Sequence, residues 1–166
     1  MDVSRFNLRF LFRSLFRLLM PATVLAASVS HAQFSQVPTP QTPQTVRESA
    51  AEIEKEYRID AARHIYANYP SRIFKGKLPP LMYSVMVVET EIDATGQVQN
   101  VHVVRKPAAD EVAPWVISMI RRAGPFPAPA KFAGPGVRYL DIWLVDKSGQ
   151  FQVDTLTEGQ RYGESR

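Results

Sequence analysis

The chain has 166 residues, with 20 basic and 16 acidic side chains and no cysteine. This length predicts one compact domain with extensions at its ends. The absence of cysteine excludes disulfides, a thiolate zinc site, a cysteine nucleophile and the leader of a lipid-anchored lipoprotein. The domain must therefore rely on a buried hydrophobic core.

The first 32 residues have the pattern of a secretory leader. An apolar run over Leu18–Val29 follows a basic segment that contains Arg5, Arg9, Arg13 and Arg17. Ser30 and Ala32 are small residues at the −3 and −1 positions of a possible cleavage site after Ala32. We therefore expect residues 1–32 to be a cleaved signal peptide and the mature protein to be periplasmic.

An uncleaved inner-membrane anchor is the main alternative. A spanning helix needs about 20 mostly apolar residues, and Arg17 lies immediately before the apolar run. An arginine near the bilayer centre costs about 2.5 to 3.5 kcal/mol, which favours cleavage. A mitochondrial transit peptide is a further alternative, because it too is rich in arginine and poor in acids.

The predicted leader carries most of the net charge. It holds four arginines and one aspartate, or +3, of a total of +4, so the remainder of the chain carries +1. A nucleic-acid partner is not expected, because a nearly neutral chain does not supply a basic stripe.

Residues 33–45 have the composition of a linker. Pro38, Pro40 and Pro43 lie among glutamine, threonine and serine, a mixture that favours extended polyproline II. The domain is expected over residues 46–157, and residues 158–166 form a polar tail.

The first element of the domain is predicted to be a helix over Val46–Tyr69. Apolar residues recur every three or four positions, at Val46, Ala50, Ile53, Tyr57, Ala61 and Ile65. Thr45 and Glu48 have the spacing of a capping box, and Pro70 ends the helix.

A hairpin is predicted next. Met86, Val88, Thr90 and Ile92 alternate with acidic residues in Tyr83–Asp93, which is the pattern of a half-buried strand. Asp93–Gly96 reads as a turn, and Val98–Arg105 returns as the partner strand.

A second helix and a third strand follow. Val112, Val116, Met119, Ile120 and Ala123 share one face of a helix within Ala108–Ala123, in whose first turn Pro114 is tolerated. Val137–Val145 alternates as a strand, and Phe151–Leu156 could pair back on it as a shorter fourth strand.

This order predicts an α+β fold, in which a small antiparallel sheet of three to four strands has two helices packed on one face.

The order and the residues together resemble the TonB C-terminal domain family over about Asn68–Val145. The shared features are a Tyr69-Pro70 pair, an Asp93–Gly96 turn between two strands, the end of a helix at Arg121-Arg122 followed by Pro125, and a closing strand at Val137–Val145. TolA-like modules and some secretin-associated modules have the same layout.

The resemblance implies a periplasmic module that takes an extended peptide from an envelope protein as an added strand. The implied edge is the third strand, at Arg138, Tyr139, Leu140, Asp141, Ile142, Trp143 and Leu144. Arg121 and Arg122 are candidate docking residues. Phe151–Leu156 could already occupy that edge.

Two features differ from a force-transducing member of the family. Such a protein keeps its membrane anchor and has a long Pro-rich spacer, whereas this leader has a cleavage site and residues 33–45 are a short linker. An anchored transducer to outer-membrane receptors and a structural envelope protein therefore stay as alternatives to the binding module.

No catalytic residues, cofactor or metal site are predicted. Outside the leader the chain has two histidines, His64 and His102, which lack the spacing of metal ligands. Glu89, Glu91 and Asp93 are interpreted as the solvated face of a strand rather than as catalytic acids. Trp115, Tyr139 and Trp143 are interpreted as residues of the core or of a sheet face.

Overall fold

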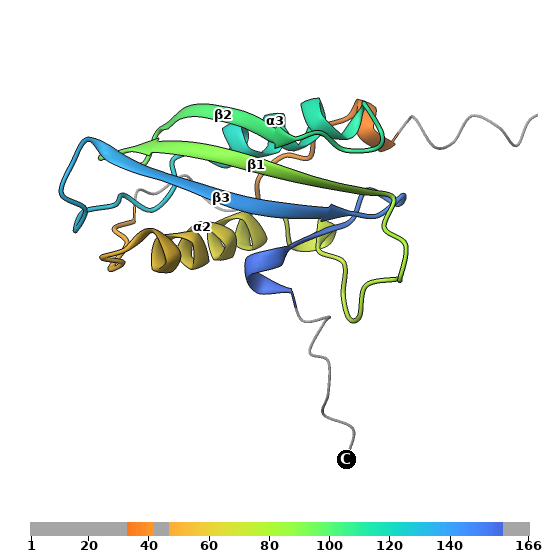
Figure 1. Ribbon diagram of the computed structural model, residues 1–166, viewed down its shortest axis with the longest axis horizontal. Helices are drawn as coiled ribbons and strands as arrows, with labels where there is room; N and C mark the ends of the chain where they lie inside the picture. Colours follow the sequence, from red (N-terminus) through yellow and green to blue (C-terminus); the bar gives the residue numbers. More distant parts are fainter. Residues whose placement is uncertain (1–32, 42–46, 158–166) are drawn as a thin grey trace, which may run out of the picture.

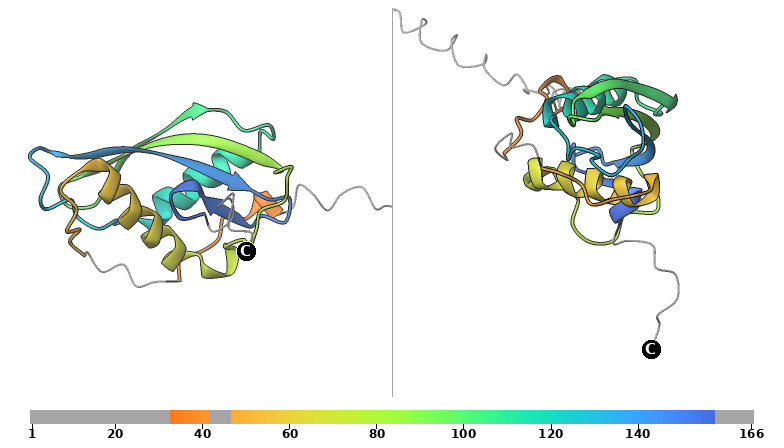
Figure 2. Two further views of the ribbon diagram at one scale, coloured as in Figure 1. Left: turned by 60° about the horizontal axis from the view of Figure 1, so that its bottom comes forward. Right: turned by 90° about the vertical axis from the view of Figure 1, so that its left-hand side faces the viewer.

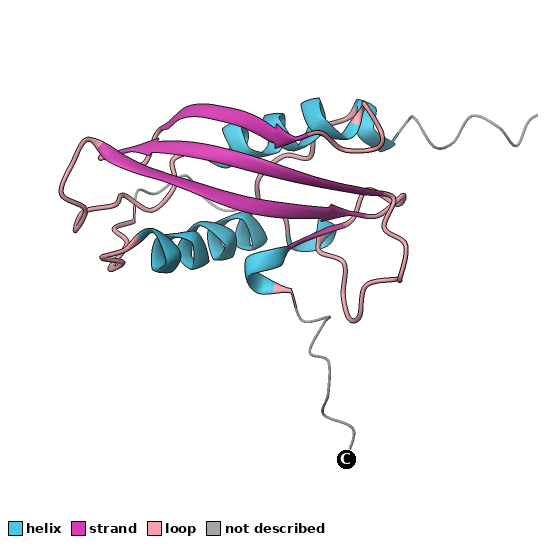
Figure 3. Cartoon of the chain, viewed as in Figure 1, coloured by secondary structure: helices cyan, strands magenta, loops and turns pink. Residues whose placement is uncertain are grey.

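Three long antiparallel strands form the centre of the molecule, and two helices cover one face of the sheet that they build (Figures 1 and 3). The computed structural model describes residues 33–41 and 47–157. The sheet order is β2-β1-β3-β4, and every pairing is antiparallel. The predicted α+β fold is confirmed.

The predicted hairpin is formed by β1 (Ser84–Asp93) and β2 (Val98–Arg105). Residues of β1 alternate between buried and half-buried, so one face of the strand looks into the core as the sequence predicts. The Asp93 carboxylate accepts hydrogen bonds from the backbone N–H groups of Thr95 and Gln97, at 2.8 and 2.9 Å. These bonds fix the turn.

Gly96 completes this turn with φ of +88°. Its carbonyl accepts a hydrogen bond of 2.7 Å from the N–H of Phe126. A Cβ at this position would run into the carbonyl oxygen of Phe126. The turn therefore requires glycine both for its backbone conformation and for this close approach.

The strand β3 (Gly136–Val145) pairs with the whole of β1 in unbroken register, from Ser84↔Val145 to Asp93↔Gly136. The strand β4 (Phe151–Val153) is shorter than expected, and a single 3-10 turn, η2 (Asp154–Leu156), follows it. Phe151 and Val153 are buried in the core.

The helix α2 (Glu54–Asn68) begins eight residues after the predicted start at Val46, so that predicted start is wrong. The reason is a long-range contact, since Glu48 forms a parallel bridge with Ala128. The N–H of Ser49 donates to the carbonyl of Ala128, and this bond holds residues 47–49 extended. The proposed cap Thr45 and the leader 1–32 lie outside the described residues, as does the tail 158–166.

The helix α3 (Val112–Ala123) has Pro114 in its first turn and buries the predicted face. Trp115 is also buried, which adds a large aromatic side chain to the core. The helices pack on the concave side of the curved sheet, as the end-on view in Figure 2 shows. Within residues 33–41 and 47–157, no helix lies on the opposite face of the sheet.

Residues 33–41, which have the composition of a linker, lie against the domain. Phe34 is buried, stacks on Tyr83 at 5.9 Å between ring centroids and meets the edge of Trp115 at 5.2 Å. The indole N–H of Trp115 donates to the carbonyl of Gln36, at 3.2 Å. We call Gln33–Gln41 the arm.

Candidate partner-binding edge

The edge of β3 is open along most of its length. The strand has ten residues, and β4 pairs with only three of them, Trp143–Val145. Seven residues, Gly136–Ile142, therefore have no strand partner among the described residues on the side away from β1. Trp143 and Leu144, which belong to the predicted edge, are covered by Val153 and Gln152.

The side chains of the predicted edge divide between the two faces of the sheet. Tyr139, Asp141 and Trp143 point into the core and are buried. Arg138, Leu140, Ile142 and Leu144 lie on the face without helices, where Leu140 is 43% exposed. Only the second set can contact a partner without disturbing the core.

The backbone groups of Leu140 face outward from the sheet. The carbonyl of Leu140 accepts a hydrogen bond from the Arg58 guanidinium of α2, at 3.4 Å. In an antiparallel strand the N–H and C=O of one residue point to the same side, and alternate residues share that side. The N–H of Leu140 and both backbone groups of Arg138 therefore point to the open edge, where the described part of the chain offers them no partner.

The far end of the open segment is closed by three side chains, Arg58, Asp141 and Thr155, which we call the cap cluster. The Asp141 carboxylate accepts from the N–H of Ile142 at 2.9 Å and from the Thr155 hydroxyl at 3.0 Å. A charged group that points inward beside an edge is a common protection against unwanted strand pairing. The bond from Arg58 is weak, because 3.4 Å exceeds the usual range.

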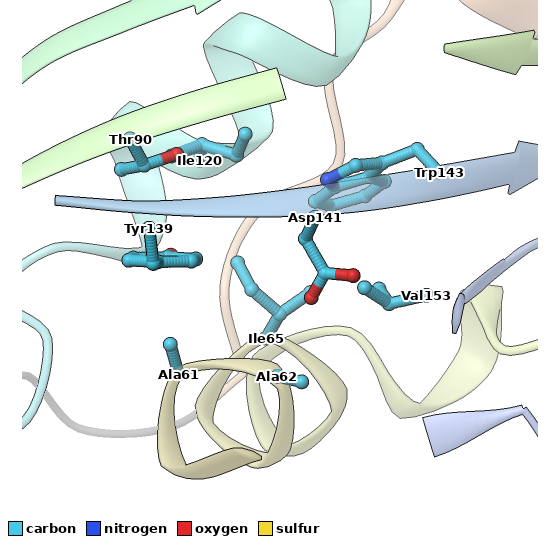
Figure 4. A pocket seen from close by; sticks show the side chains of 9 residues that line it. All are labelled: Ala61, Ala62, Ile65, Thr90, Ile120, Tyr139, Asp141, Trp143 and Val153. Carbon is cyan, nitrogen blue, oxygen red and sulfur yellow. The ribbon is translucent and has the colours of Figure 1, made fainter. Parts of the chain in front are cut away.

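Asp141 lines a small cavity between the sheet and α2 (Figure 4). The cavity measures about 10 Å³, roughly the room of one water molecule. Burial raises the pKa of Asp141 to about 6, against the hydrogen bonds from Ile142 and Thr155 and the charge of Arg58, which lower it. The cavity is too small for an organic ligand.

The β2 edge differs from the β3 edge. It has no neighbouring strand among the described residues, but its pairing with β1 shifts register twice, at Val87/Val88 and at Glu91/Ile92. Such bulges twist a strand and disrupt its ladder. The regular β3 edge is therefore the better template for an added strand.

The predicted docking residues lie at the end of α3. Arg122 donates to the carbonyl of Val37 at 3.0 Å, so it holds the arm, while the neighbouring Arg121 is exposed. A docking role for this pair stays a prediction.

The histidines lie apart from each other. His64 is half-buried, contacts the carbonyl of Ala123 at 2.7 Å and packs on Phe126. Burial lowers the pKa of His64. His102 is exposed on β2. The described residues contain no group of three or more histidine or acidic side chains placed to hold a metal ion.

Arg138 also joins the acidic face of β1. Its guanidinium lies 2.7 Å from the carboxylate of Glu91 and 3.8 Å from that of Glu89. These contacts agree with the interpretation of the acids as a solvated strand face.

Comparisons of the chain with protein-family models, with curated proteins and with solved structures find no match. Over the residues that the structure describes, no helix has the length and apolar character needed to cross a bilayer.

Proposed function

We propose that the chain is an exported, TonB-like protein-binding module that takes an extended segment of an envelope protein as a strand beside β3. The observation that carries the proposal is the regular edge at Gly136–Ile142, beside which no other described strand lies on the side away from β1. A strand bound there would pair with the backbone groups of Arg138 and Leu140 and would replace the weak bond from Arg58.

The side chains beside this edge indicate which segments it would accept. Leu140 and Ile142 offer aliphatic contacts on the sheet face without helices, next to the charged pair of Arg138 and Glu91. We expect a segment that alternates apolar residues toward this face, because side chains on neighbouring strands pack beside one another.

The packed arm supports a binding module over an anchored force transducer. A transducer must reach from its anchor across the periplasm, whereas the arm lies against the domain from Phe34 onward. Residues 33–41 therefore add no reach between a leader and the domain.

A pair of substitutions at position 140 tests the proposal. Leu140→Pro removes one outward N–H and leaves the ladder to β1 intact, because proline is tolerated at an edge whose N–H faces solvent. Leu140→Ala removes the side chain and keeps the N–H. Both variants are combined with a photoreactive residue, Arg138→p-benzoylphenylalanine, in cells that produce the protein.

We expect the photoreactive residue at position 138 to crosslink to an envelope protein. Leu140→Pro should abolish the adduct and Leu140→Ala should retain it. Lys55→p-benzoylphenylalanine, on the exposed side of α2, is the matched control and should give no such adduct. An adduct that survives Leu140→Pro would refute strand addition, and equal adducts from positions 55 and 138 would favour a structural role without a defined edge.

A further inference from the structure

A second surface of the molecule combines unpaired positive charge with exposed aliphatic side chains. It lies at the end of the sheet where β1 begins and where β2 and β3 end, since Ser84 pairs with Val145 and Val87 pairs with Arg105. We call this surface the basic end. It contains six cationic residues: Arg72, Lys75, Lys77, Arg105, Lys106 and Lys147.

Hydrogen bonds bring these segments together. The N–H of Phe74 donates to the carbonyl of Phe151, and the Gln152 side chain donates to the carbonyls of Phe74 and Gly76. The loop that carries Lys75 and Lys77 is thereby held against β4. None of the six cations forms an ion pair with another residue in the described ranges 33–41 and 47–157.

Acidic residues at this end are fewer. Asp110, Glu111 and Asp146 lie near it, and two of them have local partners: Tyr83 donates to Glu111 at 2.6 Å, and the N–H of Ser148 donates to Asp146 at 2.7 Å. Six cations against three acids leave a charge of +3. Residues 1–32, which precede the arm in the sequence, carry a separate +3.

Exposed aliphatic side chains accompany the charge. Leu81 is 89% exposed on the loop before β1, and Val104 is 54% exposed beside Arg105. Leu81 follows Pro79-Pro80, which restricts the loop that presents it. Aliphatic side chains among cations are the pattern of surfaces that contact anionic bilayers.

The arm begins at the same end. Gln33 and Arg72 both lie beside Gly149, and Phe34 of the arm stacks on Tyr83, which directly precedes β1. The apolar leader sequence directly precedes Gln33. The described chain therefore enters the domain at the basic end.

We propose that the basic end docks on an anionic phospholipid bilayer, with Leu81 inserted among the lipid headgroups. This contact is independent of strand addition, because the open segment of β3 begins at Gly136, at the other end of the strand. The molecule could then hold the membrane surface at one end and a protein partner at the other.

A fluorescent probe at a single thiol tests the docking. The chain has no cysteine, so Leu81→Cys and Ile53→Cys each give one labelling site for an environment-sensitive dye. Ile53 is 54% exposed at the start of α2 and is the matched control at the opposite end of the molecule. The labelled full chain is mixed with vesicles of phosphatidylcholine, with or without phosphatidylglycerol.

We expect the dye at position 81 to shift to the blue only with phosphatidylglycerol, and the dye at position 53 to remain unchanged. The double variant Lys75→Gln, Lys77→Gln should bind these vesicles roughly 30-fold more weakly, because each lysine near an anionic surface contributes about a factor of five to the affinity. The double variant Lys55→Gln, Lys131→Gln removes two cations elsewhere and should bind them as tightly as wild type. Inorganic phosphate alone should give no shift.

Four results would overturn the proposal. They are the absence of a shift at position 81, equal shifts at positions 81 and 53, an equal response to pure phosphatidylcholine, and a response to inorganic phosphate alone. Equal shifts at both positions would mean that the protein adsorbs to the vesicles without a preferred end. Because no protein partner is present, none of these results bears on the β3 edge.

Discussion

Thr155 donates a hydrogen bond of 3.0 Å to the carboxylate of Asp141, and this bond ties the last described turn of the chain to the centre of β3. Asp141 lies on the core side of a strand whose neighbours on that side are Tyr139 and Trp143. The cap cluster therefore joins three elements, α2, β3 and η2, at the point where the open edge ends. Its carboxylate also makes the domain sensitive to pH.

Asp141 should make the domain less stable as the pH rises through about 6. Its pKa in the folded protein is about 6, above the ordinary value of 3.8, so the folded state binds the proton more tightly. The stabilisation is fully present below pH 3.8 and is lost as the pH rises through the folded pKa. The shift in the pKa of Asp141 corresponds to about 3 kcal/mol of unfolding free energy.

Asp141→Asn isolates this contribution, because the amide oxygen can still accept from Ile142 and Thr155. Denaturant unfolding from pH 3.5 to 7.5 should show wild type losing about 3 kcal/mol relative to the variant. Glu52→Gln, an exposed acid on a loop, is the control and should follow wild type. Parallel pH profiles for wild type and Asp141→Asn would contradict the assignment.

Two isoleucines test the core that the sequence predicts. Ile92 of β1 and Ile120 of α3 are each 2% exposed. Replacement of either by alanine should cost about 2 to 5 kcal/mol of unfolding free energy. Val104→Ala, at a 54% exposed position, should cost less than about 0.5 kcal/mol. Losses below about 1 kcal/mol at both isoleucines would mean that the packed faces are different ones.

Substitution of Gly96 and of Gly76 distinguishes two costs of an added Cβ, backbone strain and steric collision with a neighbouring group. Both have positive φ, +88° and +85°, but a Cβ at Gly96 would meet Phe126, whereas at Gly76 it meets nothing within 4 Å. Gly76→Ala should cost about 1 to 2 kcal/mol from backbone strain alone. Gly96→Ala should cost clearly more in the same urea titration, and equal losses would show that the turn yields without strain.

The packing of the arm predicts that Phe34 stabilises the domain. Phe34→Ala should reduce the unfolding free energy by about 3 kcal/mol, because it empties the site between Tyr83 and Trp115. Tryptophan emission should shift to the red as Trp115 becomes exposed. Gln36→Ala keeps the backbone carbonyl that Trp115 contacts and should behave as wild type. A stable Phe34→Ala variant with unchanged emission would mean that the arm does not pack in solution.

The sequence predicts the sheet and α3 well because their patterns are local. The alternation in β1 and the apolar face of α3 each follow from neighbouring residues alone. The start of α2 could not be predicted in this way, because the bridge between Glu48 and Ala128 joins segments far apart in the chain. The arm is missed for the same reason, since Phe34 is a single aromatic residue in a stretch of linker composition.

The candidate edge could be predicted only in part. The pattern of β3 places Leu140 and Ile142 on one face, and the resemblance to the TonB C-terminal domain family suggests the edge. The length of β4 determines how much of that edge is open. β4 pairs with only three residues of β3, and a strand this short leaves no clear pattern in the sequence. The cap cluster did leave a signal, because Asp141 stands at a position where the alternation of β3 calls for an apolar residue.

Amide hydrogen exchange along β3 tests the central claim most directly. In the free protein, the amides of Arg138 and Leu140 should exchange fast, whereas those of Tyr139 and Asp141, which face β1, should exchange slowly. The amides of Ile142 and Leu144 should also be slow, because Asp141 and β4 cover them. An extended segment of the crosslinked partner, at saturation, should slow the exchange of Arg138 and Leu140. Amides at these two positions that are already protected in the free protein, or that keep exchanging fast at saturation, would contradict an open edge that accepts a strand.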